Sequence, residues 1–235
     1  MKLAIVTGGS RGLGQELCLQ LQALGYQVVE FSRSAPHPFS CRLDLASPIR
    51  AAEIASASLA QFKPESLSEL LYFNNAATLA PIGFTWKHER LATVENIQTN
   101  ITGQILLISE VIRHFRSAPG EKKIVNISSG AALKGYAGWT LYCAAKAGLE
   151  GFIRSLAAEE AHQSHPFTAL TVDPGVMDTE MQSLIRRSSP QDFPDVARFI
   201  QRQRDGGLES PAAVASALLE LVLSDTVSPG ERGSV

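Results

Sequence analysis

Short apolar segments alternate with longer amphipathic segments along most of the chain. In the segment from Gly12 to Leu24, for example, leucines recur at helical spacing and a glycine follows. The apolar segments predict β-strands at Leu3–Val6, Gln27–Ser32, Leu71–Phe73, Lys123–Ile127 and Phe167–Val172. The amphipathic segments predict helices at Gly12–Leu24, Ser47–Leu59, Trp86–Phe115 and Tyr142–Ala161, and a last helix that begins at Ser210-Pro211.

Strands this short and apolar, each separated from the next by a helix, indicate a parallel sheet that is covered on both faces. We therefore predict an α/β protein in which residues 1–235 form one domain, with a Rossmann-type, doubly wound parallel sheet and helices on both faces. The polar segment Ser188–Gly207 lies in a region, about 176–207, that we interpret as a lid over the ligand site. An ordinary surface excursion is the alternative.

Composition narrows the class of protein without indicating a function. The chain has 235 residues, of which 45% are hydrophobic and 19% charged, and its formal net charge is −2. This balance gives no general attraction to nucleic acid or membrane lipid, and the longest apolar stretches are too short to cross a bilayer. The start of the chain is typical of a first strand rather than a signal peptide, and three widely spaced cysteines favour a reducing cytoplasm.

No metal site is predicted, because none of the five histidines has ligand spacing. The charge runs Arg186-Arg187 and Arg202-Gln203-Arg204 are typical of solvated surfaces, although an anionic partner is an alternative.

A glycine-rich turn, Thr7–Gly14, joins the first strand to the first helix. Such a turn lets backbone N–H groups approach a pyrophosphate at a helix N-terminus, although a turn that merely saves space is an alternative. The second strand ends at Ser32-Arg33, and Arg11 stands in the turn. Two guanidinium groups and a hydroxyl suit the 2′-phosphate of NADP, whereas Glu30 precedes the strand tip. Two solvated arginines remain the alternative interpretation.

Tyr142 and Lys146 stand four residues apart, so a helix places them on one face. A free phenol has a pKa of about 10, and a nearby ammonium lowers it, which makes Tyr142 a candidate acid–base group. Ser129 follows the strand at Lys123–Ile127, at the edge of the sheet where this fold binds its ligand. Asn74-Asn75-Ala76-Ala77 follows another strand, and Asn100 lies within a predicted helix.

Taken together, these segments resemble the short-chain dehydrogenase/reductase family in the right order and over nearly the whole chain. The family's TGxxxGxG pattern is matched at Thr7–Gly14, its NNAG motif at Asn74–Ala77 with an alanine in place of the glycine, and its PG motif with a following threonine at Pro174–Thr179. Its active-site residues fall on Asn100, Ser129, Tyr142 and Lys146. Within the family, the segments around Ser129, Trp139 and Met181 resemble bacterial benzil reductases, which are similar to sepiapterin reductases.

The resemblance implies an NADPH-dependent carbonyl reductase that acts on a ketone or diketone. Ser129 and Tyr142 would hold the carbonyl oxygen, Tyr142 would supply the proton, Lys146 would lower the pKa of Tyr142 and hold the nicotinamide ribose, and Asn100 would position a water. The implied NADP-binding residues are Gly8, Ser10, Arg11, Gly12, Leu13, Gly14, Ser32, Arg33, Asp44, Asn75, Ala76, Tyr142, Lys146, Pro174, Gly175, Val176 and Thr179.

The predicted substrate contacts are Ser129, Leu133, Trp139, Tyr142 and Met181, with Val176 as a further apolar candidate. Alternatives are a sepiapterin-type or 3-oxoacyl-type reductase, or a non-catalytic dinucleotide sensor. The small-molecule carbonyl substrate is the only ligand besides NADP that we expect, and a homodimer is a family expectation.

Overall fold

A computed structural model describes residues 1–235, which form one sheet of seven parallel strands. The strands are β1 (Lys2–Thr7), β2 (Gln27–Ser32), β3 (Ser40–Arg42), β4 (Glu69–Asn74), β5 (Glu121–Ile127), β6 (Thr168–Asp173) and β7 (Arg232–Ser234). Their order is β3-β2-β1-β4-β5-β6-β7. The chain moves outward from β1 to β2 on one side and returns to place β4 on the other. Such a reversal opens a crevice at the carboxyl ends of β1 and β4.

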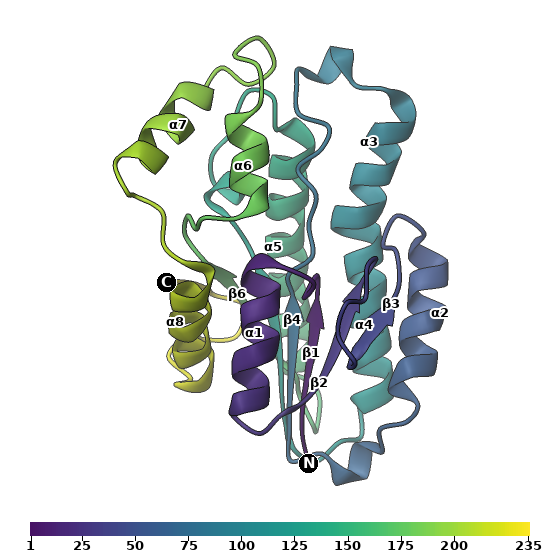
Figure 1. Ribbon diagram of the computed structural model, residues 1–235. Helices are drawn as coiled ribbons and strands as arrows, with labels where there is room; N and C mark the ends of the chain where they lie inside the picture. Colours follow the sequence, from purple (N-terminus) through teal and green to yellow (C-terminus); the bar gives the residue numbers. More distant parts are fainter.

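Helices cover both faces of the sheet, which confirms the predicted fold class (Figure 1). They are α1 (Gly12–Ala23), α2 (Pro48–Leu59), α3 (Arg90–Ile97), α4 (Gly103–Phe115), α5 (Thr140–Glu160), α6 (Glu180–Arg186), α7 (Val196–Arg204) and α8 (Pro211–Leu223). None of them combines the length and the apolar character that crossing a membrane requires.

The alternation of side chains along the strands produces two separate cores. In β1, Leu3 and Ile5 join a cluster with α2, α4 and α5, whereas Ala4 and Val6 join a cluster with α1 and α8. All four side chains are fully buried. Because successive residues of a strand point to opposite faces, one apolar strand supplies both cores, which is why these strands read as continuous apolar segments.

A third, smaller apolar cluster lies beyond the carboxyl edge of the sheet. It joins Trp139 to Phe193 and Phe199, which come from the loop between α6 and α7 and from α7 itself. Trp139 stacks on Phe193 at 4.5 Å between ring centroids and contacts Phe199 edge-on at 5.4 Å. Figure 1 shows α6 and α7 above the sheet edge, apart from the helices that flank the sheet. The segment at 176–207 therefore forms a packed roof.

Two of the sequence-based expectations were wrong in detail. The predicted helix Trp86–Phe115 begins only at Arg90, because Thr85–Lys87 is a separate 3₁₀ turn followed by extended backbone at His88 and Glu89. The two edge strands β3 and β7 were missed. Each has only three residues and lacks a long apolar run, so neither carries the local signal of a buried strand.

The α1–α8 face provides a test of the packing. Leu218 of α8 is fully buried, so Leu218→Ala should lower the free energy of unfolding by about 2–5 kcal/mol. Leu19 of α1 is 47% exposed, so Leu19→Ala should change that free energy by about 0.5 kcal/mol or less. Urea denaturation followed by circular dichroism measures both. Equal effects of the two substitutions would contradict the assigned core.

Candidate active site

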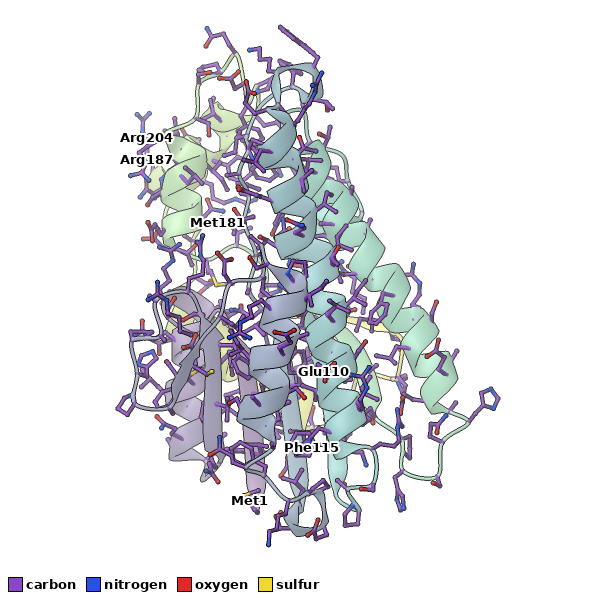
Figure 2. The ribbon with its side chains drawn as sticks, turned by 90° about the vertical axis from the view of Figure 1, so that its right-hand side faces the viewer. Met1, Glu110, Phe115, Met181, Arg187 and Arg204 are labelled. Carbon is purple, nitrogen blue, oxygen red and sulfur yellow. The ribbon has the colours of Figure 1, made fainter.

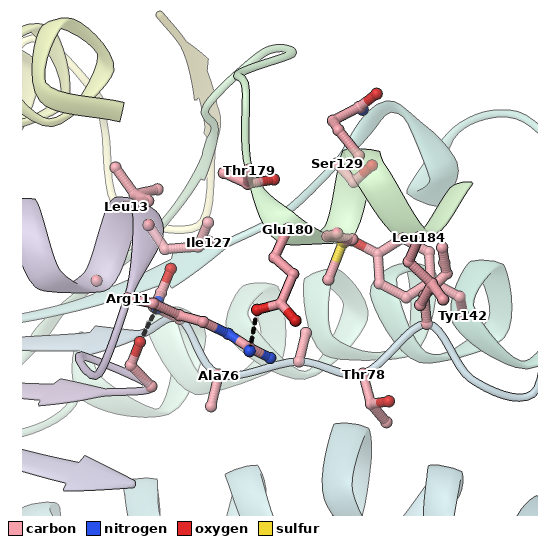
Figure 3. A pocket seen from close by; sticks show the side chains of 18 of the residues that line it. Arg11, Leu13, Ala76, Thr78, Ile127, Ser129, Tyr142, Thr179, Glu180 and Leu184 are labelled. Carbon is pink, nitrogen blue, oxygen red and sulfur yellow. Dashed lines mark hydrogen bonds and ion pairs between the residues drawn. The ribbon is translucent and has the colours of Figure 1, made fainter. Parts of the chain in front are cut away.

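A cleft of about 1500 Å³ opens at the carboxyl edge of the sheet, below the α6–α7 roof. In Figure 3 the glycine-rich turn, marked by Arg11 and Leu13, lies at one end of this cleft and Tyr142 at the other. Loops that follow β1, β2, β4, β5 and β6 all contribute to its walls. All of the residues that were expected to bind NADP line this cleft.

The glycine-rich turn is built so that backbone, rather than side chains, faces the cleft. Gly8 has a positive φ of 70°, and a Cβ there would lie 2.9 Å from the Ala76 backbone. A Cβ on Gly14 would lie 2.3 Å from the Gly8 carbonyl oxygen. The helix α1 that follows has no side-chain cap at its N-terminus. Its first N–H groups are therefore free to donate to an anion such as a pyrophosphate.

Thr7 ties this turn to the loop after β4. Its Oγ1 accepts hydrogen bonds of 3.0 Å from the backbone N–H groups of Asn75 and Ala76. In return, Asn75 Nδ2 donates to the Thr7 carbonyl at 2.9 Å. The two loops that flank the crevice are thus held as one unit.

Glu30 is buried beneath the glycine-rich turn instead of facing the cleft. It is fully buried, and its carboxylate accepts from the Gly9 N–H at 2.9 Å and from the Ser32 hydroxyl at 3.1 Å. The Ser40 hydroxyl donates to the same carboxylate. An acid in this position cannot hold a ribose hydroxyl in the cleft. The Ser32 hydroxyl donates its hydrogen to the same buried carboxylate.

The two arginines that were predicted to act together point in different directions. Arg11 forms an ion pair with Glu180 at the start of α6, which Figure 3 shows as a bridge across the cleft. Both side chains are more than half exposed, so this pair contributes little stability. Arg33 is exposed at the end of β2 and has no ion-pair partner, and Asp44 is an exposed residue of the loop after β3. Of these two arginines, only Arg33 therefore presents an unpaired guanidinium.

Ser129 and Tyr142 lie close together at the other end of the cleft. Ser129 caps the short turn Gly130–Ala132, where its Oγ accepts from the Ala131 N–H at 3.2 Å. Tyr142 lies in the first turn of α5 and is 7% exposed. Burial raises the pKa of the Tyr142 phenol to about 12, while the neighbouring Ser129 hydroxyl acts in the opposite direction. At neutral pH the phenol therefore retains its proton and can donate it.

Lys146 lies one turn further along α5 and is 5% exposed. Its ammonium donates to the Ile127 carbonyl at 2.6 Å and lies 5.6 Å from the centroid of the Tyr142 ring. Burial lowers the pKa of Lys146 to about 8. Lys146 is not among the groups that set the pKa of Tyr142 in this structure, where burial has the largest effect, so its role in lowering that pKa stays a prediction.

A network that the sequence did not indicate lies behind Lys146. Arg232 of β7 pairs with both Glu150 of α5 and Asp173 of β6, and the Ser128 hydroxyl donates to Glu150 at 2.5 Å. These two carboxylates favour the charged form of Lys146 and so oppose the effect of burial on its pKa. The last strand thereby anchors the acids beside the buried ammonium. Only the long-range pairing of β7 with β6 brings Arg232 there.

Asn100 lies in a single π-helical turn, Gln98–Thr102, between α3 and α4. Its side chain is 3% exposed, accepts from the Thr78 N–H and donates to the Thr78 carbonyl, both at 2.8 Å. A second donation, of 3.1 Å, goes to Asn96. Asn100 does not line the cleft and both its amide hydrogens are used, so its observed task is to fix the loop after β4.

The predicted substrate contacts divide into two groups. Trp139 and Met181 line the cleft together with Ser129 and Tyr142. Leu133, in contrast, is 73% exposed and does not line it, because the turn Gly130–Ala132 directs the chain outward. A contact between Leu133 and the substrate stays a prediction that the lining of this cleft does not support. Tyr136, which sequence reasoning missed, lines the cleft and contacts Trp139 at 4.9 Å between ring centroids.

A family model described as short chain dehydrogenase matches residues 2–190. The chain belongs to this family. A benzil reductase ((S)-benzoin forming) of Bacillus subtilis is 36% identical over 96% of this chain and 95% of that protein. A sepiapterin reductase of Mus musculus is 34% identical over 97% of this chain and 94% of that protein. The crystal structure of the KRED1-Pglu enzyme superimposes with a TM-score of 0.85 at 26% identity, covering 99% of this chain and all of that one.

In this short-chain dehydrogenase, Ala77 stands where the family's NNAG motif has glycine. Its φ is not positive, so the backbone there does not need a glycine. Its side chain is half-buried against the Trp139 cluster. The substitution therefore extends the apolar wall of the cleft without strain.

The buried ammonium makes stability depend on pH in a defined direction. The pKa of Lys146 falls from 10.5 to about 8 on folding, so between these values the unfolded chain binds more protons and folding becomes more favourable as the pH rises. We expect Lys146→Met to have a higher free energy of unfolding than the wild type at pH 7. This difference should shrink by on the order of 1–2 kcal/mol at pH 9.5, because the wild type becomes more stable as the pH rises. Urea unfolding at the two pH values measures this; an advantage that did not change with pH would contradict the buried charge.

Proposed function

We propose that this short-chain dehydrogenase is an NADPH-dependent carbonyl reductase that converts a ketone or diketone into the corresponding alcohol or hydroxy ketone. The observation that carries the proposal is the group of two hydroxyls, of Ser129 and Tyr142, beside the buried ammonium of Lys146 at the carboxyl edge of β5. Hydroxyl donors fixed in a water-poor site stabilise the negative charge that develops on a carbonyl oxygen during reduction.

Each residue of the group has a separate task. The Ser129 hydroxyl and the Tyr142 phenol donate to the carbonyl oxygen, and Tyr142 transfers its proton to that oxygen as charge develops. The raised pKa of Tyr142 keeps that proton in place before the reaction. Lys146 has two N–H donors left after its bond to the Ile127 carbonyl, and these are available to a ribose. Asn100 holds the loop after β4, and a water bound near it stays a prediction.

The cleft fits a dinucleotide by three features of the chain itself. Gly8 and Gly14 leave no room for side chains, the N-terminus of α1 lacks a side-chain cap, and Asn75 fixes the facing loop. NADPH, when bound, supplies the hydride. Leu13, Pro174, Gly175, Val176 and Thr179 line the space between the turn and the catalytic group, together with Ser10, Gly12 and Ala76.

The ribose end of the cleft favours NADP over NAD. Glu30 is buried away from the cleft, and Arg33 offers an unpaired guanidinium there. Arg11 can join it only by leaving the exposed Glu180, which costs little. Solved relatives support this choice through the fold: a short chain dehydrogenase from Burkholderia cenocepacia in complex with NADP has a TM-score of 0.77 at 23% identity.

The aromatic wall of Trp139, Phe193 and Phe199 favours an aryl or otherwise apolar carbonyl compound. Two relatives from Bacillus species are benzil reductases, which supports benzil, a diketone, as the first substrate to test. Sepiapterin is the alternative supported by the mouse relative, and a 3-oxoacyl substrate by a reductase of Pseudomonas aeruginosa that is 34% identical over 77% of this chain. Rates of NADPH consumption with the three substrates separate these proposals. Movement of the roof, a homodimer and a cytoplasmic location stay predictions.

Replacement of Tyr142 by phenylalanine tests the proton donor. Tyr142→Phe should lower kcat for benzil reduction by several orders of magnitude, because it removes both the proton and one hydrogen bond to the carbonyl oxygen. The dissociation constant of NADPH should change little. Tyr26→Phe is the matched control, since its hydroxyl contacts Glu69 at the opposite end of the strands. Near-wild-type turnover by Tyr142→Phe would exclude the assigned role.

Replacement of Arg33 by alanine tests the choice of cofactor. If its guanidinium binds the 2′-phosphate, Arg33→Ala should raise the KM for NADPH by about 10-fold to 100-fold and leave the KM for NADH unchanged. The control is Arg50→Ala, whose side chain is 72% exposed and pairs with Glu53 on α2. Steady-state kinetics with both cofactors provides the measurement. A parallel rise of both KM values would show that Arg33 does not recognise the phosphate.

A further inference from the structure

Three arginines line the roof side of the cleft: Arg187 at the end of α6, and Arg198 and Arg202 on α7. No carboxylate lies within ion-pair distance of any of them. Arg202 is only partly exposed, yet its guanidinium has no hydrogen-bond partner in the protein. We call these three residues the arginine wall.

Four of the five acids of the roof have a partner outside the arginine wall. Glu180 pairs with Arg11 of the glycine-rich turn, and Asp192 pairs with Lys87 of the loop before α3 at 2.7 Å. Asp178 lies 3.6 Å from Arg186, and Asp205 accepts from Gln201 at 2.7 Å. Asp195, the residue before α7, has no ion-pair partner, and Asp178 and Glu180 line the same cleft as the arginines. The three residues of the arginine wall nevertheless have no carboxylate within ion-pair distance.

The position of Arg198 is not explained by helix stability. It is the third residue of α7, and a positive charge in the first turn of a helix opposes the helix dipole. Arg198 and Arg202 are also like charges four residues apart, which weakens a helix further. Arg202, in the last turn, does gain from the dipole, but Arg198 does not. The cost in helix stability is small, but both arginines that cause it line the cleft.

The arginine wall is close to the proposed reaction site. Phe199, next to Arg198, contacts Trp139 at 5.4 Å between ring centroids, and Trp139 contacts Tyr142 at 6.1 Å. Arg187 and Met181 line the same cleft, although Figure 2 shows Arg187 toward the outer side of the α6–α7 segment. A molecule whose carbonyl reaches Tyr142 along the aromatic wall therefore extends toward the α7 side of the cleft, which Arg198 and Arg202 line.

We propose that the arginine wall binds an anionic group, a carboxylate or a phosphate, at the end of the substrate remote from the reacting carbonyl. The inference rests on the proposed reductase function and adds the substrate class to it: an apolar or aryl carbonyl compound with an acidic end. Guanidinium groups bind carboxylate and phosphate through paired N–H donors, and two or three of them around one anion suit either group.

A carboxylate on the opposite wall of the cleft offers the arginines a different partner. Glu95 of α3 is exposed, lines the cleft and has no ion-pair partner. If the roof closed on α3, Glu95 could pair with Arg198 or Arg202, and the arginines would then serve closure instead of substrate binding. The substitution Glu95→Gln separates the two, because only closure requires the carboxylate.

The test compares two probes that differ in charge and by one methyl group: benzil-4-carboxylate and its methyl ester. The wild type should reduce the acid with a kcat/KM at least about tenfold higher than the ester, because the acid gains a charge-assisted contact. In Arg198→Gln/Arg202→Gln this ratio should fall to about one. Arg204→Gln is the matched control, since Arg204 lies on the same helix but does not line the cleft, and it should preserve the ratio.

The outcomes are distinct. A wild-type ratio near one, or a ratio that the double substitution leaves unchanged, would overturn the proposal, as would a loss of the ratio in Glu95→Gln. Retention of the ratio in Glu95→Gln supports it. If neither probe nor benzil is reduced, the proposed reductase function fails instead. Calorimetric titration of both probes into the NADP-saturated protein then still decides the charge preference, and equal affinities would refute it.

Discussion

The burial of a lysine ammonium and a tyrosine phenol side by side is the constraint on which the rest of the site depends. An ammonium in so dry a place is stable only when it is held by hydrogen bonds and opposite charges. The Ile127 carbonyl supplies the first, and Glu150 and Asp173 supply the second. Arg232 in turn pairs with both carboxylates. The carboxyl end of β5, the helix α5 and the last strand β7 are therefore coupled through one group of charges.

The molecule divides into a floor and a roof with different sequence requirements. The floor consists of strand ends and short turns whose backbone groups are fixed by Thr7, Asn75 and Glu30. The roof is held by aromatic stacking on Trp139 and by the ion pair between Lys87 and Asp192. In the proposed reductase, floor residues would determine the chemistry and the cofactor, and roof residues would determine which carbonyl compounds fit. Under that proposal, exchange of roof residues would alter the substrate without disturbing the proton donor.

The sequence was informative wherever the chemistry is local. The spacing of Tyr142 and Lys146 on one helix and the glycines after β1 could be read directly, and the apolar strands specified the core. Features that depend on distant segments could not be predicted. Arg232 comes near Lys146 only because β7 pairs with β6, and Glu30 is turned inward by Gly9 and two serine hydroxyls. The burial that raises the pKa of Tyr142 could likewise not be read from the sequence, because burial is a property of the folded chain.

The transfer of deuterium tests the central claim, that this cleft performs hydride reduction of a carbonyl. Benzil is reduced with NADPH that carries deuterium at the transferable position of the nicotinamide, and the product is examined by mass spectrometry and proton NMR. The account predicts one deuterium on the carbinol carbon of the hydroxy ketone, and no product above background with Tyr142→Phe. A reduced product without deuterium on that carbon, or equal product from the variant, would contradict it.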